Sequence, residues 1–538
     1  QQNTAVGSQA LKDGTTAAQN VAIGAFSLDA LLNGAFNVAV GNQALGAATS
    51  SNQNTAVGYR AMLSTTTGAE NVAVGGDALS TNTTGSSNVS VGQGSLENST
   101  TASNNTAVGK DALNQNTTGT NNVAVGAYSL DANTTGDSNV AHGTSTLSAN
   151  TTGINNTAVG HSAGALNTTA NNMTAVGYAA LNQNTTGASN TAIGRDALEK
   201  NTTADNNTAC GSFTLQDNTT GASNTAVGRS ALENNTTANE NTAVGMNALK
   251  INTEGARNVA VGYSALDANT TASQNTAIGY EAMTSCTTGY SNTAIGHGAL
   301  DTMTTAYDNN AFGVDCLRSC TTGVNNTANG KDALASCTTG NHNTAIGKNA
   351  GNDLTTGGSN IFLGINAGDG QVTTAHDNLF IARSGVAAGN AGCFIYGNTS
   401  GSCFQGDNTS NWSTTSDQRL KKDISTNTVG LSIINNVTVR NFKYKQYSDG
   451  SPVTTDDTVD MSEFPDADNL NQVLIGQGKT ETQIGIIAQE LETIAPNCVS
   501  TSSRGVKTVV TDELFWYMIN AIKELSTKNT ALETRVAT

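Results

Sequence analysis

Residues able to carry out nucleophilic chemistry stand together in one short stretch. It reads Ser416-Asp417-Gln418-Arg419-Leu420-Lys421-Lys422. A serine hydroxyl is a weak nucleophile until a base takes its proton, and a lysine can act as that base only when its pKa is lowered towards neutrality. Since residues five apart do not share a helix face, a turn must lie between Ser416 and Lys421 for them to meet. The structural alternative is that Ser416 and Asp417 simply cap a helix.

No other group of reactive side chains has a spacing that predicts a metal or cofactor site. The eight cysteines follow neither a zinc-binding nor a disulfide-framework pattern, so we expect no metal and no cofactor. Cys320 and Cys337 occupy equivalent positions 17 residues apart. They could form a disulfide between neighbouring coils, or they could fill two slots of a side-chain ladder as small groups.

Most of the chain that precedes the Ser416 stretch is built on a five-residue motif, Asn54-Thr55-Ala56-Val57-Gly58, which recurs every 17 residues. Its glycine returns from Gly7 to Gly364, which makes 22 copies. Such a strict period is typical of a solenoid of stacked coils. Aromatic residues make up 4% of the chain and charged residues 12%, so the core must be thin and shared between neighbouring coils.

Each position of the consensus N-T-A-V-G-x-x-A-L-x-x-N-T-T-G-x-x predicts a structural role. The T-A-V-G segment predicts an extended strand, and we expect its Val, with the Leu, to point into the coil. The first Asn predicts a ladder of side-chain amides. N-T-T-G predicts a turn in which Gly supplies a positive φ. Seventeen residues allow two short strands and two turns, and 22 coils at about 4.8 Å each predict a rod of roughly 100 Å. Departures from the consensus include Met173 at the Asn position and Gly164, Gly351 and Gly368 at the Leu position.

Three other interpretations of the Asn and Thr richness have to be weighed. Asn-Thr-Thr fits the N-glycosylation sequon, although turns favour the same residues. Rows of Asn and Thr could bind ice or flat polysaccharide, although charged and aromatic residues at the variable positions would interrupt a flat surface. A calcium-binding solenoid needs regularly placed aspartates, and these recur only in some coils, at Asp77, Asp111, Asp196 and Asp332.

The charge of the chain argues against two classes of partner. The net charge is −17, of which residues 1–416 carry −13 and residues 417–538 carry −4. An acidic shaft does not favour the phosphate backbone, so we expect no nucleic acid partner. No run of 18 apolar residues occurs, so we expect no membrane insertion. The chain begins at Gln1 without a leader segment, which we interpret as a processed or truncated start.

The composition predicts three regions in a mostly β protein. Residues 1–369 are expected to form a parallel β-solenoid or β-roll shaft, and residues 370–416 a cap or stem with strands at 379–381 and 393–396. Residues 417–538, with prolines and larger side chains, predict a small α+β domain that ends in a coiled-coil helix at about 512–538. Apolar residues at spacings of three and four, with one core Asn that could fix the register, mark that coiled coil: Phe515, Met518, Ile522, Leu525, Asn529, Leu532 and Val536.

Both parts of the chain resemble known families. The repeat resembles the head repeats of trimeric autotransporter adhesins, which form a left-handed β-roll in a trimer, although the period here is longer, and it is also similar to the shafts of phage and virus fibres. The stretch from Ser416 to Ile424 resembles the opening of the intramolecular chaperone auto-processing domain of endosialidase-type phage tailspikes. That resemblance continues in Asn441-Phe442-Lys443-Tyr444-Lys445, Ile484-Gly485-Ile486-Ile487-Ala488-Gln489-Glu490, Asp512-Glu513-Leu514 and Ala521-Ile522-Lys523-Glu524-Leu525.

The second resemblance implies assembly into a trimer followed by self-cleavage between Ser416 and Asp417. It implies that Ser416 is the nucleophile and Lys421 its general base, with Lys422 as the alternative base. Arg419, Gly485, Gln489 and Glu490 belong to the matching motifs. Family members commonly carry a His just before the Gly-x-x-Ala-Gln-Glu motif, but residues 417–538 contain none, which predicts slow or absent cleavage if that His assists proton transfer. At most, the activity is a single-turnover self-cleavage without an external substrate.

The leading hypothesis is therefore a homotrimeric structural and adhesive fibre, most simply a phage tail fibre located in the virion. Its partners would be itself, a receptor or glycan on the host cell, and other virion proteins. The alternative is a cellular surface adhesin of the trimeric autotransporter type, which needs a C-terminal anchor of amphipathic strands where this sequence has a polar coiled coil. A glycan-degrading tailspike ranks last, because no insertion in the repeats is large enough to place paired carboxylates in a groove.

Overall fold

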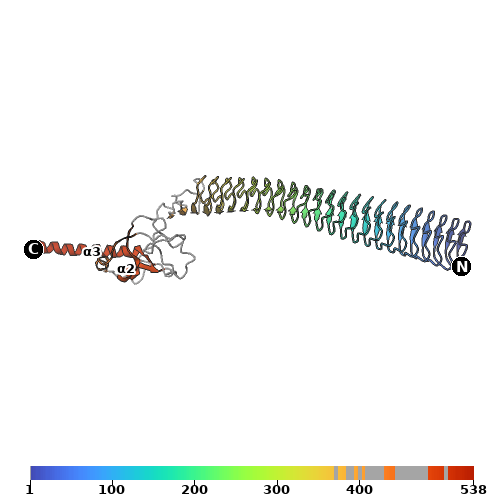
Figure 1. Ribbon diagram of the computed structural model, residues 1–538, viewed down its shortest axis with the longest axis horizontal. Coiled ribbons are helices and arrows are strands. Elements are labelled where there is room, and N and C mark those ends of the chain that lie inside the picture. The colour runs from blue at the N-terminus through green and yellow to red at the C-terminus, as the bar shows by residue number, and fades with distance from the viewer. Residues whose placement is uncertain are drawn as a thin grey trace, which may run out of the picture. The chain divides into compact units, whose positions relative to one another are not determined.

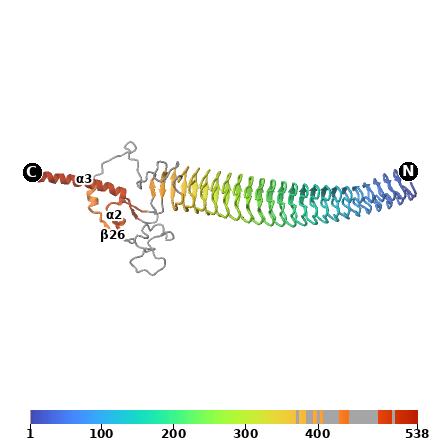
Figure 2. The ribbon, with the colours of Figure 1, turned by 90° about the horizontal axis from the view of Figure 1, so that it is seen from above.

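The computed structural model describes residues 2–368, 373–382, 393–397, 403–405, 429–442, 483–501 and 507–537. The chain divides into two compact units, Gln1–Trp412 and Ser413–Thr538. The first unit is a continuous stack of coils, and both views show its short strands lying one above the next (Figure 1, Figure 2). The predicted parallel β-solenoid is therefore confirmed.

Each of the 22 repeats contributes one three-residue strand at the same position of the motif. The strands are β1 (Thr4–Val6), β2 (Val21–Ile23), β3 (Val38–Val40), β4 (Thr55–Val57), β5 (Val72–Val74), β6 (Val89–Val91), β7 (Thr106–Val108), β8 (Val123–Val125), β9 (Val140–His142), β10 (Thr157–Val159), β11 (Thr174–Val176), β12 (Thr191–Ile193), β13 (Thr208–Cys210), β14 (Thr225–Val227), β15 (Thr242–Val244), β16 (Val259–Val261), β17 (Thr276–Ile278), β18 (Thr293–Ile295), β19 (Asn310–Phe312), β20 (Thr327–Asn329), β21 (Thr344–Ile346) and β22 (Ile361–Leu363).

Neighbouring strands pair in parallel with a register of one repeat, so that Ala56 lies beside Ala73. The ladder runs one strand beyond residue 369, because β23 (Leu379–Ala382) pairs in parallel with β22 through a coil that is one residue longer. Two antiparallel strands follow, β24 (Cys393–Gly397) and β25 (Cys403–Gln405). The strands predicted at 379–381 and 393–396 are thus confirmed.

The interior of each coil is filled by the central Ala of the strand and by the Leu of the opposite side. Ala56 and Leu45 are completely buried. The prediction that the Val of the motif points inward is wrong: Val74 is 38% exposed and Ile193 is 42% exposed. Side chains alternate along a strand, so the inward position must be the middle one, and a small Ala there leaves room for the Leu that comes from across the coil.

The prediction of a second strand in each coil is also wrong, because the side opposite the strand is a run of turns. Gln43 and Leu45 have φ values of 61° and 53°, which an extended strand does not allow. This side is still hydrogen-bonded from coil to coil. The N–H of Leu45 donates to the carbonyl of Ala61 at 3.0 Å, and the N–H of Ala47 donates to that of Leu63 at 2.9 Å.

The repeat glycine is required by both conformation and space. Gly75 has φ +142°, and a Cβ there would lie 2.5 Å from the carbonyl oxygen of Gly92 in the next coil. The glycine of the N-T-T-G turn does not have the predicted positive φ. A Cβ at Gly119 would instead lie 2.4 Å from the carbonyl oxygen of Gly136, so close approach between coils accounts for this glycine.

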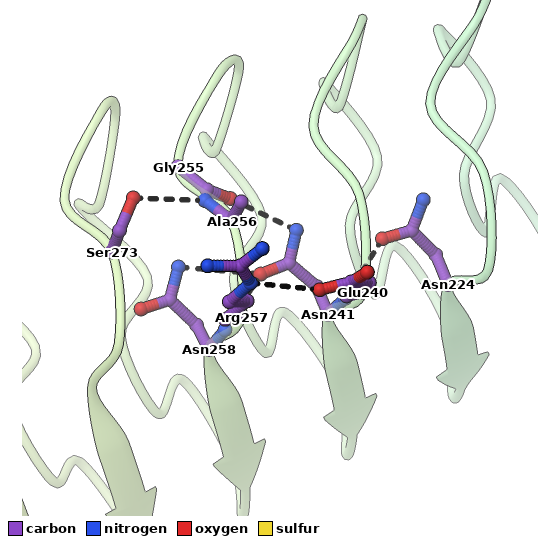
Figure 3. Close-up of polar contacts among 8 residues, drawn as sticks. All are labelled: Asn224, Glu240, Asn241, Gly255, Ala256, Arg257, Asn258 and Ser273. Carbon is purple, nitrogen blue, oxygen red and sulfur yellow. Dashed lines mark hydrogen bonds and ion pairs between the residues drawn. The ribbon is translucent and has the colours of Figure 1, made fainter.

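The predicted asparagine ladder is confirmed. The side chain of Asn37 donates to Oδ1 of Asn20 at 3.0 Å and to the carbonyl of Ser51 at 2.9 Å. Figure 3 shows the same arrangement for Asn224, Asn241 and Asn258. Each amide satisfies buried backbone groups of two coils, which a small apolar residue could not do.

A second buried ladder is formed by the Asn of N-T-T-G, which stands in ten successive coils from Asn116 to Asn269. The side chain of Asn133 donates to Oδ1 of Asn116 at 2.8 Å. These asparagines are completely buried, so the sequons at these positions have no accessible amide for a glycan in the folded coil.

Departures from the consensus compensate for one another across the coil. Gly164 lacks the usual Leu side chain, and the Cε of Met173, which replaces a ladder Asn, lies 2.7 Å from where a Cβ would be. Gly351 and Gly368 both face Phe362, which replaces the central Ala, at 2.7 and 2.4 Å from their Cβ positions. Each larger side chain therefore fills the volume that a missing Leu leaves empty.

The second unit is small and contains both helices and short strands. Its described elements are α1 (Leu431–Ile434), β26 (Arg440–Phe442), β27 (Gln483–Gly485), α2 (Ala488–Ile494), the 3-10 turn η4 (Pro496–Cys498), β28 (Val499–Thr501), β29 (Lys507–Val509) and α3 (Thr511–Val536). The strands form two antiparallel pairs, β26–β27 and β28–β29. Leu491, Ala495, Cys498 and Leu514 form the buried core.

Candidate assembly and contact site

The residues predicted to carry out self-cleavage lie outside the described residues. This applies to Ser416, Asp417, Arg419, Lys421 and Lys422. Their roles as nucleophile, cleavage position and base therefore stay predictions.

The second chaperone motif lies where β27 meets α2, and it includes an ion pair that sequence reasoning did not find. Gly485 ends β27 opposite Arg440 of β26, and Glu490 stands in the first turn of α2. The Arg440 guanidinium donates to both carboxylate oxygens of Glu490, at 3.1 and 2.8 Å. The carboxylate raises the pKa of Arg440. This pair connects β26 to α2, whereas Gln489 is exposed.

The ion pair has a signal in the sequence that could have been used. Arg440 directly precedes the motif Asn441-Phe442-Lys443-Tyr444-Lys445, and Glu490 ends the motif that starts at Ile484. A basic first motif and a second motif that ends in an acidic residue are candidates for an ion pair, and a two-pronged Arg–carboxylate contact fixes relative orientation. A second ion pair joins Lys507 of β29 to Glu492 of α2.

The long helix α3 presents a row of exposed apolar side chains. Leu514 and Ala521 are buried against the rest of the unit, where a Cβ at Gly430 would come within 2.3 Å of the Ala521 nitrogen. The predicted coiled-coil residues face solvent: Phe515, Met518, Ile522, Leu525, Leu532 and Val536 are 46–82% exposed. Trp516, which the prediction omitted, is 59% exposed. Asn529 donates to Glu533 of its own helix.

A second apolar surface runs along the shaft, and we call it the outer sheet face. It consists of the first and third residues of β1–β22, which point away from the coil interior. The first position holds 13 Thr, seven Val, one Ile and one Asn, and the third holds Val, Ile, Phe or Leu in 19 strands. None of these strands contains Asp, Glu, Lys or Arg. Sequence reasoning missed this face because it placed the Val inside.

Charged residues of the shaft lie instead at the corners of the coil, where they form ion pairs. The aspartates considered for calcium each face a cation: Arg60–Asp77 at 3.4 Å, Lys110–Asp111 at 3.4 Å, Arg195–Asp196 at 2.9 Å and Lys331–Asp332 at 3.7 Å. Arg257 and Glu240 form another such pair at 2.8 Å (Figure 3). Within the described ranges no three His, Cys, Asp or Glu side chains gather as metal ligands would.

Cys320 and Cys337 fill the slots that the Asn of N-T-T-G holds in other coils, as the simpler of the two interpretations predicted. Cys320 and Cys337 are free thiols next to the carbonyls of Gly323 and Gly340. Burial raises the pKa of Cys320 to about 12 and that of Cys337 to about 11. Thiols with such pKa values react slowly. Cys210, the third residue of β13, is exposed on the outer sheet face.

The turn of each coil carries a row of exposed threonines, which bears on the ice and polysaccharide interpretation. Thr118, Thr135 and Thr152 are exposed at equivalent positions of successive coils. Glu254 interrupts the row. No other feature of the described coils points to a ligand at this row, so this interpretation stays a prediction.

Comparison with known proteins finds a family match in the second unit. Residues 416–500 match the family described as chaperone of endosialidase. Neither the curated proteins nor the solved structures contain a match. The family implies self-association as a trimer in general and a location in a phage appendage. Together with the β-solenoid shaft, the match fits a phage fibre with a C-terminal chaperone domain. Among the helices that the structure describes, none has the length and apolar character of a membrane span.

Proposed function

We propose that this chain is the subunit of a homotrimeric phage tail fibre, which projects a contact surface towards a receptor or glycan on the host cell. The observation that carries the proposal is the order of its two parts. A chaperone-family match over residues 416–500 lies C-terminal to an acidic solenoid of 22 repeats, with a short region of three further strands between them. A long shaft with one repeated surface suits a structural role, and its charge keeps the particle soluble.

The chaperone domain has a physical task in such a fibre. Neighbouring coils are nearly identical, so three shafts could align with shifts of whole repeats, and such misalignments trap folding chains. The exposed apolar row on α3 is a surface through which three chains could associate before their shafts fold. A coiled coil of three α3 helices would then bring the shafts together in register.

Self-cleavage after assembly completes the proposal. Lys421 would take the proton of the Ser416 hydroxyl, the serine oxygen would take over the acyl group as the C–N bond to Asp417 breaks, and the Asp417 nitrogen would receive the proton. Water would then hydrolyse the ester, so that each chain is cut once and leaves a Ser416 carboxylate and an Asp417 amine. This requires an environment that lowers the pKa of the lysine towards neutrality. The match to the chaperone family begins at Ser416 itself, which supports this position as the boundary.

The test is the intact mass of the denatured chain, measured for the wild type and for Ser416→Ala. We expect the wild type to lack residues 417–538 and the variant to be full length. Lys421→Ala should behave as Ser416→Ala does, while Lys422→Ala should still be cleaved. If all four chains are full length, the domain is at most a retained clamp, and the self-cleavage part of the proposal is wrong.

The trimer is tested separately by sedimentation equilibrium under native conditions. We expect the mass of three chains for the wild type and for Ser416→Ala, because cleavage follows assembly. Replacing two exposed apolar residues of α3, Ile522→Asp with Leu525→Asp, should reduce the yield of trimer during refolding. The matched control Lys523→Asp, on the same helix, should not. A wild-type mass of one chain would contradict the proposed fibre.

A further inference from the structure

We propose that the outer sheet face is the surface through which three copies of the shaft meet, parallel and in register around a common axis. This inference rests on the trimer of the proposed function. It assigns that contact to the shaft itself, in addition to the C-terminal helix.

The composition of the face differs from that of the rest of the shaft. Residues 1–416 carry a net charge of −13, yet none of the 22 strands contains an acidic or basic residue other than His142. Several of its apolar side chains are exposed to a similar extent, among them Val159 at 37%, Val227 at 38% and Ile346 at 46%. Charge is depleted at the core of protein interfaces, while an apolar patch of this length on a free surface would favour aggregation.

The face is large enough for a stable contact. Two outward positions in each of the 22 strands give 44 positions in all. A specific interface of standard size uses about 20–30 residues from each partner. The corners that flank the face carry the ion pairs, such as Arg60–Asp77. An apolar centre with a charged border is the usual arrangement of an interface.

The period identifies the partner as another copy of this chain. A partner that uses the face over its full length must present matching groups every 17 residues, 22 times, and a second shaft does this. In the described coils the strand side carries exposed apolar residues in nearly every coil, while the Leu of the opposite side is buried. Exposed apolar side chains elsewhere, such as Tyr59, Ile154 and Tyr280, do not recur from coil to coil. An apolar face without a complementary second face can be covered by its own copies, and in the proposed trimer of parallel shafts the three copies of the face would meet around the symmetry axis.

Four of the five departures from Val or Ile in the third strand position, all except Leu363, would then act as marks of the register. They are His142, Cys210, Phe312 and Asn329, where most strands have Val or Ile. In an aligned trimer each of these side chains meets its own copies, so that the Asn329 amides can bond one another. A shift by one coil would put Asn329 against Phe312 or Ile346 and leave a buried amide unpaired. The contacts of the other strands do not offset the free energy that this unpaired amide costs.

Cys210 allows a direct test, because a disulfide forms only between sulfur atoms that come together. The purified chain is treated with copper–phenanthroline under air, which removes two electrons and two protons from a pair of thiols. Three thiols at one axis can form one disulfide, so we expect up to two-thirds of the chains as a linked pair on a non-reducing gel. The variant Cys210→Ser should lose this band.

The matched control moves the thiol to another side of the same coil and keeps the shaft unchanged. Thr220 lies exposed on the turn of that coil, and we expect Thr220→Cys in the Cys210→Ser background to give no linked pair. As a second measurement, Val227→Asp should lower the trimer fraction on dilution, because three carboxylates would meet at the axis. Thr220→Asp should not.

The outcomes separate this inference from the proposed function. A trimeric mass with linkage at Cys210 and none at position 220 supports the inference. A trimeric mass with no linkage at Cys210, or with linkage at position 220, overturns it and leaves the proposed function standing. The mass of a single chain overturns both.

Discussion

The shaft and the C-terminal unit are stabilised in opposite ways, the shaft by a repeated core and the C-terminal unit by a core that does not repeat. In the shaft, buried Ala and Leu and two asparagine ladders recur in coil after coil, and each coil contacts only its neighbours. The described core of the C-terminal unit consists of a few residues that do not repeat, with one long helix exposed along much of its length. A periodic structure can begin to fold at any repeat, and its consensus positions hold no information about alignment, which leaves only the few departures such as Asn329 to mark the register. The aperiodic unit can supply further alignment information in the proposed trimer.

The largest expected effect concerns the spacing between coils, and two adjacent glycines test it. Gly75→Ala forces an unfavourable φ and places a methyl group 2.5 Å from the Gly92 carbonyl oxygen. We expect it to lower the free energy of unfolding by about 3 kcal/mol or more. A methyl group at Gly76 would have no neighbouring atom within 4 Å, so Gly76→Ala should stay within about 0.5 kcal/mol. Denaturant unfolding compares the two, and equal losses would contradict the close stacking.

The second prediction tests the compensation within one coil. Gly164→Leu should cost about 1–3 kcal/mol because Met173 already fills the space. Met173→Asn should cost about 2 kcal/mol because it leaves that space empty. The double variant restores the consensus of most other coils and should recover at least about 1 kcal/mol of the summed loss. A double-mutant cycle measured by thermal unfolding checks this, and additive losses would show that the two side chains do not share one volume.

The third prediction concerns the pH dependence of the shaft. Burial raises the pKa of Asp131, and one of its carboxylate oxygens has no hydrogen-bond partner. Because the folded state holds the proton more tightly than the unfolded state, ionised Asp131 lowers stability at neutral pH, and this loss disappears as the pH falls below the usual carboxylate range. Asp131→Asn should therefore stabilise the chain by about 1 kcal/mol at pH 7 and by nothing at about pH 3. Equivalent positions already hold Asn, at Asn114 and Asn182.

The control for this prediction is a carboxylate of the same charge that accepts two hydrogen bonds. Asp137 accepts hydrogen bonds from the N–H and the hydroxyl of Thr120, at 2.6 and 2.9 Å. Asp137→Asn should therefore not stabilise the shaft at either pH. If both substitutions raise the melting temperature equally, the general reduction of negative charge is responsible, and the burial of Asp131 is not.

The smallest expected effect lies in the C-terminal unit. Arg440 and Glu490 are both partly exposed, with 53% and 38% of their side chains accessible, and such pairs contribute about 0.2–1 kcal/mol. We expect Arg440→Gln to cost about 0.5 kcal/mol at low salt and less at high salt, where the charges are screened. If the substitution lowers the free energy of unfolding by more than about 2 kcal/mol and salt does not change that loss, this pair determines the fold of the unit, unlike the exposed ion pairs of the shaft.

Most of the shaft could be predicted, because its structure follows from a sequence motif that repeats at a fixed spacing. The spacing of the glycines set the number of coils, and the recurring Asn predicted the ladder that Asn20 and Asn37 form. The second strand was predicted wrongly, because the positive φ of Leu45 leaves no signal in a residue that ordinarily avoids that region. The ion pair between Arg440 and Glu490 joins residues 50 positions apart, and such long-range contacts are not visible in local patterns.

The residue pattern alone sets the period, the parallel stacking, the asparagine ladder and the change of character near residue 416. Each of these follows from residue types repeated, or ceasing to repeat, at a fixed spacing. Which side of the strand lies inside is settled only when the coil closes. Alternation defines two faces, with Ala on one and Thr and Val on the other, but the closed coil takes the smaller side chain because the Leu occupies the remaining width. The same closure brings Gly164 to Met173 and Phe362 to Gly351, and it leaves the apolar side chains on the outside, where a second and third copy can cover them.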